Sequence, residues 1–413
     1  MVDLWQPIER KYRNRKHLYI YVVIVLVYFM TAFVRLRSVE HNIALPTRLL
    51  IYSLVFPLIF FTIQLAILIL IPHKSVLLFF YILPGLNVIY MLRFNVFLFL
   101  ICGLVLFILI LHLNNILSSP DYVFIGQLTQ IGAKMIVMFY FTVVILMIPC
   151  YVQNIIFLVV EYYCSLSDNF SLWYVIIVLI SSFQLLLNIL LYNDVIGTFV
   201  SSLLYCNIMY HKISYWKKVV ASAKNTFYCF GSLFKSEYLR VKSNIWDIRS
   251  DLESSALFLN EGTQNYSALV LNRCRYDWFV IYLAITGRSF ESTCRELKNV
   301  ITPNESAFLQ INRITTKLFT LGLPVYFYTF LSFYYIFFKV NVFGNAEFKS
   351  ARFRILLVFL VCCCTLYYAF YKYLAQAVFF LYANYKEDFE CEYPSYYQMV
   401  TNGIPTGYRV QQH

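Results

Sequence analysis

The stretch SLWYVIIVLISSFQLLLNILLYNDVIGTFVSSLLYC, residues 171–206, is an almost unbroken apolar run that contains a single carboxylate, Asp194. As one continuous helix it would extend about 54 Å, well beyond the roughly 30 Å hydrocarbon core of a bilayer. We therefore expect a membrane-spanning helix that continues into the cytoplasm, with Asp194 hydrated near the inner edge of the membrane. The alternative is a carboxylate that shares a face with Thr198 and Ser201 and lines a wet path.

The composition of the whole chain is that of a multi-pass membrane protein. Hydrophobic residues make up 61% of the 413 positions and charged residues 13%, whereas a soluble domain has roughly half apolar and a quarter charged residues. The predicted fold class is all-α: a polytopic helical membrane protein with seven or eight transmembrane helices and a helical cytoplasmic loop. Apolar runs of spanning length predict spans at 18–35, 49–71, 75–92, 94–113, 135–161, 172–207, 317–338 and 354–382.

Basic segments predict the orientation of the chain. Residues 1–17 and the loop 208–316 both carry an excess of lysine and arginine, which favours a cytoplasmic location for both. An even number of crossings then separates them, so eight spans and a cytoplasmic tail at 383–413 are expected. The formal charge of +12 is assigned to residues that set topology and contact anionic lipid, and no motif points to nucleic acid. Without a Gly/Ser/Pro-rich boundary, residues 1–413 are interpreted as a single polytopic membrane domain.

The cytoplasmic loop is predicted to be helical. WDIRSDLESSALFLNEG (246–262) and FESTCRELKNVI (290–301) have helical spacing with charges on one face. ALVLNRCRYDWFVIYLAITG (268–287) is apolar but contains two arginines and an aspartate, so it is interpreted as an amphipathic helix at the membrane interface or in a cytoplasmic bundle.

Polar residues inside the spans are the candidate site residues, because they are costly in a bilayer. Lys372 and Gln376 share a face of the last span. Lys372 lies near mid-span, so it is either a pore-facing cation or a member of an ion pair with Glu161 or Asp194.

Gln153 and Asn154 form the second candidate pair, in the span that contains Pro149. Their amides can bond to the carbonyl freed by the proline, or they can face a ligand. Aromatic residues make up 19% of the chain, and they fit either interfacial belts or a pocket for a small apolar ligand.

Signatures of enzymes and of metal sites are absent from the sequence. There is no GxSxG, P-loop or HExxH motif, so neither an enzyme nor a bound cofactor or metal is expected. Most of the 11 cysteines fall in predicted spans, where cysteine behaves as a small apolar residue.

Several features together resemble the insect gustatory and odorant receptor superfamily and its gustatory-receptor-like relatives. They are a basic cytoplasmic N-terminus, a long helix that continues into a charged helical loop, and aromatic-rich spans such as YFYTFLSFYYIFF (326–338) and TLYYAFYKYLAQAVFF (365–380). The resemblance implies a chemosensory receptor of seven helices that assembles as a ligand-gated cation channel in the plasma membrane. The family's Thr-Tyr and Gln-Phe signature is not present in the last span, so no pore residue is transferred.

Two other classes remain open from the sequence. A transporter or lipid-handling protein would use Asp194 and Lys372 for coupling or for headgroup binding. A non-conducting membrane adaptor would dock a partner through its basic loop, or through the acidic segment KEDFECE (386–392) of a tail that could also be disordered. The expected partners are membrane lipids, further subunits in a homo- or hetero-oligomer, and a small apolar ligand.

Overall fold

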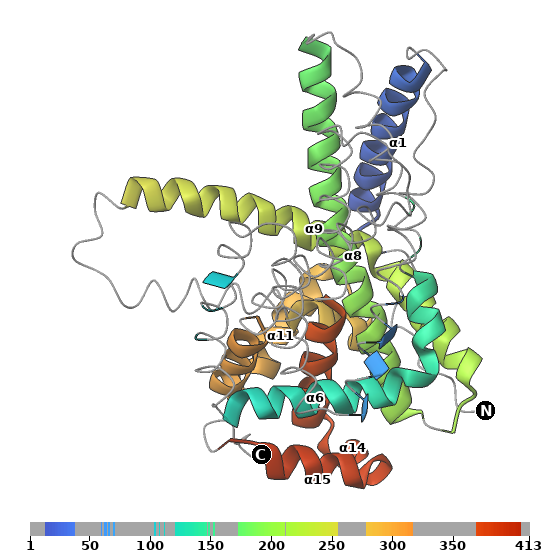
Figure 1. The fold of residues 1–413 in the computed structure, drawn as a ribbon, viewed down its shortest axis with the longest axis vertical. Helices are drawn as coiled ribbons and strands as arrows, with labels where there is room; N and C mark the ends of the chain where they lie inside the picture. Colours follow the sequence, from blue (N-terminus) through green and yellow to red (C-terminus); the bar gives the residue numbers. More distant parts are fainter. Residues whose placement is uncertain are drawn as a thin grey trace. The chain divides into compact units, whose positions relative to one another are not determined.

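The computed structural model describes residues 13–37, 120–146, 172–210, 212–254, 278–316 and 369–405, together with isolated positions from 59 to 152 (Figure 1). Every regular element among the described residues is a helix, which confirms the predicted all-α class. The chain divides into two compact units, each built from distant segments. Unit 1 comprises residues 1–25, 190–313 and 376–413, and unit 2 comprises residues 26–189 and 314–375.

Two long helices coincide with predicted spans. Helix α1 (Arg15–Arg37) contains the predicted segment 18–35, and α8 (Leu172–Met209) contains 172–207. Asn14 directly precedes α1; its φ is 50°, and its carbonyl accepts the backbone N–H of His17 at 2.9 Å. Asparagine is one of the few residues that adopt a left-handed backbone conformation at low cost, so the chain can turn sharply into the helix.

Helix α6 (Pro120–Ile136) and the short helix η2 (Val137–Phe139) begin well before the predicted span 135–161. A proline at the first helical position and Asp121 in the first turn explain the earlier start, since both favour a helix N-terminus. By length and composition alone, two helices among the described residues could cross a membrane, Pro120–Leu146 and Ile189–Met209. The predicted spans 75–92 and 317–338 lie outside the described residues, and 49–71 and 94–113 are described only at isolated positions.

The loop 208–316 contains the helices that its sequence predicts, where it is described. Helix α11 (Phe290–Ile301) matches the predicted segment 290–301, and the short helix η3 (Thr302–Asn304) follows it. Helix α9 (Tyr215–Ser254) includes the start of the predicted segment 246–262. Residues 278–286 form a helix that corresponds to the end of the predicted segment 268–287.

The C-terminal tail is folded from 386 to 403. It forms α14 (Lys386–Glu392) and α15 (Pro394–Gly403), which pack on the end of the preceding helix. The Tyr382 ring lies 5.5 Å from the Tyr397 ring, and the Tyr382 and Thr401 hydroxyls are 3.3 Å apart. This segment is therefore part of unit 1, whose core also holds the aromatic cluster of Trp278, Phe308, Phe379 and Phe380.

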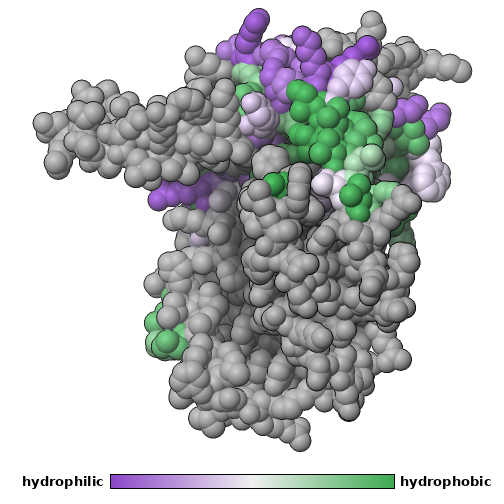
Figure 2. Space-filling view, turned by 90° about the horizontal axis from the view of Figure 1, so that it is seen from above, coloured by the Kyte–Doolittle hydropathy of each residue, from purple (hydrophilic) through white to green (hydrophobic). Residues whose placement is uncertain are grey.

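Helix α1 leaves most of its large apolar side chains uncovered. Val23, Met30 and Phe33 are 56%, 66% and 64% exposed, whereas Tyr21 and Tyr28 are buried. Figure 2 shows hydrophobic residues exposed beside hydrophilic ones on the face that is seen from above. An exposed apolar surface of this kind marks a region that binds lipid or protein.

Candidate functional site

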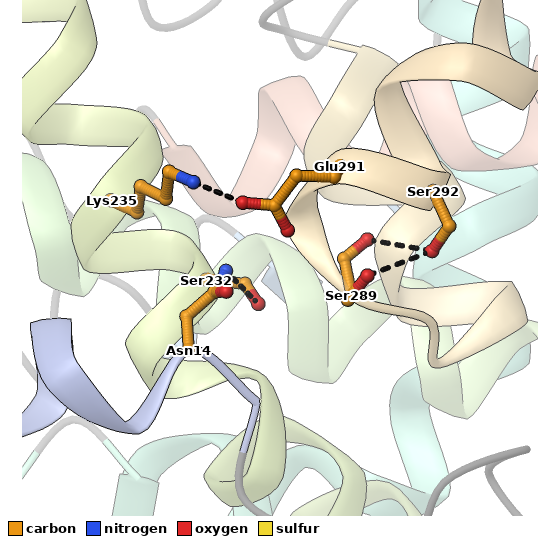
Figure 3. Close-up of polar contacts among 6 residues, drawn as sticks. All are labelled: Asn14, Ser232, Lys235, Ser289, Glu291 and Ser292. Carbon is orange, nitrogen blue, oxygen red and sulfur yellow. Dashed lines mark hydrogen bonds and ion pairs between the residues drawn. The ribbon is translucent and has the colours of Figure 1, made fainter.

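Polar side chains gather where the start of α1, the middle of α9 and the start of α11 meet, entirely within unit 1 (Figure 3). We call this cluster the polar junction. Its members are Arg13 and Asn14 before α1, His17 in its first turn, Gly231, Ser232 and Lys235 on α9, and Ser289, Glu291 and Ser292 around the start of α11.

The backbone before α1 lies directly against α9. The N–H of Arg13 donates to the carbonyl of Tyr228 at 3.2 Å. A Cβ atom built on Gly231 would lie 2.4 Å from the Arg13 carbonyl oxygen and 2.8 Å from that of Asn14. No side chain fits at these distances, so the contact requires glycine at position 231.

Two side-chain hydrogen bonds fasten the same segment to α9. The buried Arg13 guanidinium donates to Cys229 Sγ at 2.9 Å, and Asn14 Nδ2 donates to Ser232 Oγ at 3.2 Å. Burial raises the pKa of the Cys229 thiol to about 11, although Arg13 acts in the opposite direction. The thiol therefore stays neutral at physiological pH and serves as a weak acceptor for Arg13.

A buried network continues from Cys229 into the core of unit 1. The thiol donates to Asn225 Oδ1 at 3.6 Å, and Asn225 Nδ2 donates at 2.8 Å to both Ser202 Oγ and the Ala284 carbonyl. The network connects α9 to α8 and to the helix at 278–286. Buried polar groups that are hydrogen-bonded in this way fix the geometry of a core, because leaving any one unpaired is costly.

The third side of the polar junction is an ion pair at the start of α11. Lys235 pairs with Glu291, and its Nζ lies 4.8 Å from the centre of the Phe290 ring. The hydrogen bond from Lys235 lowers the pKa of Glu291 below its ordinary value. The pKa of His17 is also lowered, first by burial and then by the charge of Lys235.

Two serines are hydrogen-bonded to each other at the start of α11. Ser292 Oγ donates to the Ser289 carbonyl at 3.1 Å, and the two hydroxyls are 3.0 Å apart. Glu291 lies in the first turn, where a carboxylate is favoured by the helix dipole. The serine bonds and the ion pair of Lys235 with Glu291 thus lie in the same turn of α11.

The contacts of the polar junction join three helices of unit 1 to one another. The charges of Lys235 and Glu291 are directed at each other, and the Cys229 thiol is held neutral. Within the residues that the structure describes, no group of three His, Cys, Asp or Glu side chains could hold a metal ion.

The candidate residues predicted from the sequence fall partly in unit 1, partly in unit 2 and partly outside the described residues. Lys372 belongs to unit 2, is 8% exposed, and has its Nζ 5.7 Å from the centre of the Tyr373 ring. Gln376 belongs to unit 1, is fully buried, and donates through Nε2 to Asn312 Oδ1 at 2.7 Å. Gln153, Asn154 and the suggested ion-pair partner Glu161 lie outside the described residues.

The expectation that Asp194 is hydrated is wrong. Asp194, in unit 1, is only 3% exposed, and its backbone carbonyl accepts a hydrogen bond from the Thr198 hydroxyl at 2.8 Å. Thr198, Ser201 and Ser202 beside it are also buried. The end of the apolar run is therefore a helix that is buried within unit 1 among both apolar and polar side chains.

Sequence reasoning missed the polar junction. None of its residues stands out alone, because arginine, serine and lysine are ordinary near the ends of helices. One signal was available in Gly231, a lone glycine within a helical pattern, which often marks a close backbone approach. No protein-family model matches this chain, and no curated protein matches its sequence.

Proposed function

We propose that this chain is a multi-pass receptor of the plasma membrane, similar to insect gustatory receptors, that forms a subunit of a ligand-gated cation channel. Seven or eight helices would cross the bilayer, and unit 1 would form a helical body on the cytoplasmic side. The observation that carries the proposal is the pairing of an apolar, exposed helix α1 with a polar junction at its start. Where a membrane-spanning helix passes into a part of the protein that is exposed to water, an apolar helix surface is expected next to polar contacts.

The exposed side of α1 supports a lipid-facing span. Leu26, Val27 and Met30 are 56%, 52% and 66% exposed. Exposing this apolar surface to water is unfavourable, whereas its contact with lipid chains is not. A helix also satisfies its own backbone hydrogen bonds inside a bilayer.

The polar junction supports a role in passing movement between the span and the body. Any tilt of α1 would stretch or compress the hydrogen bonds of Arg13 and Asn14 with α9. It would also disturb the ion pair between Lys235 of α9 and Glu291 of α11. Packed interfaces of this kind respond by switching between discrete arrangements. We assign the polar junction to the coupling of ligand binding among the spans with the state of the cytoplasmic body.

Electrophysiology tests this function directly. The full chain is expressed in cells that show no ligand-gated cation current of their own, and currents are recorded while small apolar and planar ligands are applied. We expect cation currents that depend on a ligand, and Lys372→Met should change their ion selectivity, because a buried cation beside a pathway repels permeating cations. Surface-expressed protein that gives no current with any ligand, in cells or in planar bilayers, would contradict the channel.

A non-conducting adaptor is the second candidate, and α14 favours it. Glu387, Asp388 and Glu390 are exposed on this ordered helix, where they present a negative surface to a basic partner. An adaptor would conduct no ions. It would lose a partner when these three residues are changed to glutamine, without any change in its folding.

A further inference from the structure

Helix α9 carries an exposed apolar stripe. Trp216, Val220, Phe227 and Tyr238 are 70%, 47%, 60% and 52% exposed. Trp216, Phe227 and Tyr238 follow one another at intervals of eleven residues, which is close to three full turns, so the four side chains lie within about 40° around the helix axis. We call these four residues the α9 stripe.

The start of α1 lies on this same side of α9. Gly231, under the carbonyl oxygens of Arg13 and Asn14, comes eleven residues after Val220 and therefore continues the α9 stripe. The Tyr21 ring of α1 packs 5.0 Å from the ring of Phe230, which directly precedes Gly231, and 5.5 Å from the ring of Phe234, about one turn after Gly231. If α1 leaves α9 on the side of these contacts, the membrane that it enters faces the α9 stripe.

Basic side chains border the α9 stripe. Lys217 and Lys224 are exposed, lie seven residues apart, and project from one edge of it. Arg15 and Lys16, at the base of α1, are also exposed. Aromatic and apolar residues flanked by lysine and arginine are the signature of a helix that lies in the interface of an anionic membrane.

We propose that α9 lies in the cytoplasmic interface of the membrane, with the α9 stripe at the boundary between headgroups and acyl chains and with Lys217 and Lys224 bound to anionic phospholipid headgroups. This inference rests on the proposed function in one respect, namely that α1 spans the bilayer. It adds a lipid dependence, since the helix that carries the polar junction is also the helix that binds the lipid.

Photo-crosslinking of the full chain tests the proposal. A benzophenone amino acid is placed at Phe227 or at Tyr238, and the purified protein is reconstituted in vesicles of phosphatidylcholine, with or without phosphatidylserine. We expect phospholipid adducts by mass spectrometry at both positions after irradiation. The matched control is the same group at Gln398, an exposed position on α15, which should give none.

Two kinds of result would overturn the proposal. If Phe227 and Tyr238 give as few lipid adducts as Gln398, the α9 stripe faces water. If they give crosslinked dimers in place of lipid adducts, a second copy of the chain covers the stripe. Benzophenone at Met30 separates these failures from failure of the spanning proposal, because Met30 should give lipid adducts in every case in which α1 spans the bilayer.

The lysines are tested in the same vesicles. Lys217→Gln and Lys224→Gln should each lower the yield of phosphatidylserine adducts at Phe227 by roughly five-fold relative to phosphatidylcholine adducts. Arg295→Gln removes an exposed charge from α11 instead and should leave the ratio unchanged. An equal ratio in the native protein and in all variants would refute binding of anionic headgroups.

Discussion

Two glycines show how differently the two units join their helices. In unit 1, Gly231 lets the backbone of Arg13 and Asn14 lie against α9, and hydrogen bonds surround the contact. In unit 2, Gly132 of α6 lies against Leu374, and a Cβ there would meet Leu374 Cδ2 at 3.1 Å and the Leu374 carbonyl oxygen at 3.3 Å. The first contact is polar and has no spare room, whereas the second is largely apolar and slightly looser.

The difference has a physical cause in the partner of each glycine. A backbone carbonyl cannot move without breaking the hydrogen bonds that hold the segment before α1. At Gly132 the nearest atom, Leu374 Cδ2, is the end of a side chain and can shift by a few tenths of an ångström at low cost, while Leu374 Cβ and its carbonyl oxygen, at 3.2 and 3.3 Å, need a similar small shift of the backbone. Small residues that admit a bulky neighbour are also how helices pack inside membranes, where dispersion contacts replace the hydrophobic effect.

The largest expected effect is that of Gly231→Ala. The clash with two carbonyl oxygens should cost about 3 kcal/mol, and the better helix propensity of alanine offsets about 1 kcal/mol of it. We therefore expect a net loss of about 2 kcal/mol, with displacement of Arg13 from Cys229. A thiol reagent should then modify Cys229 in the variant and not in the native protein, with the exposed Cys294 and Cys391 as internal references.

Gly126→Ala is the matched control for this change. Gly126 is also helical, but a Cβ there would have no atom within 4 Å outside its own helix. The variant should be as stable as the native protein or about 1 kcal/mol more stable, with Cys229 still protected. If both glycine variants behave alike, the close contact at Gly231 is not formed.

The second effect concerns the buried pair of Gln376 and Asn312 in unit 1. Gln376→Leu leaves the Asn312 amide without this donor, which should lower stability by about 1–3 kcal/mol. Adding Asn312→Leu should restore part of the loss, because both polar groups are then removed. Thermal unfolding of the purified single and double variants measures the coupling between the two residues. Additive losses would show that the pair is not formed.

A smaller effect is expected for Gly132→Ala in unit 2. The new methyl group would press on Leu374 at distances that a small shift relieves, so the clash and the gain in helix propensity should nearly cancel. We expect a change below about 1 kcal/mol. Thermal unfolding of Gly132→Ala and Gly231→Ala under the same conditions measures this. An equal loss of stability in the two variants would show that the two glycine contacts do not differ.

The sequence predicted the helices better than their contacts. Apolar runs identified α1 and α8, and the charge pattern of 290–301 identified α11, because both signals are local. The start of α6 and the fold of the tail at 386–403 were missed, since they depend on a capping proline and on tertiary contacts of Tyr382. The polar junction and the burial of Asp194 could not be predicted, because each depends on segments far apart in the sequence.

The smallest effect is the pH dependence of the polar junction. The pKa of His17 is lowered from 6.5, chiefly by burial, and that of Glu291 is lowered from 4.5, chiefly by the hydrogen bond from Lys235. A lowered pKa in the folded state means that stability is complete above the ordinary pKa and declines as the pH falls below it. The polar junction should therefore weaken in two steps, first below 6.5 through His17 and then below 4.5 through Glu291.

His17→Gln separates the two steps. Between about pH 8 and about pH 5, the thermal midpoint of the native protein should fall more than that of this variant, because only histidine titrates in that range. Lys235→Gln should lower stability by less than about 1 kcal/mol at neutral pH, since the ion pair is partly exposed. It should also make the histidine step smaller, because without the charge of Lys235 the pKa of His17 in the folded state lies closer to its ordinary value of 6.5. An unchanged pH profile in both variants would show that neither His17 nor Lys235 controls this contact.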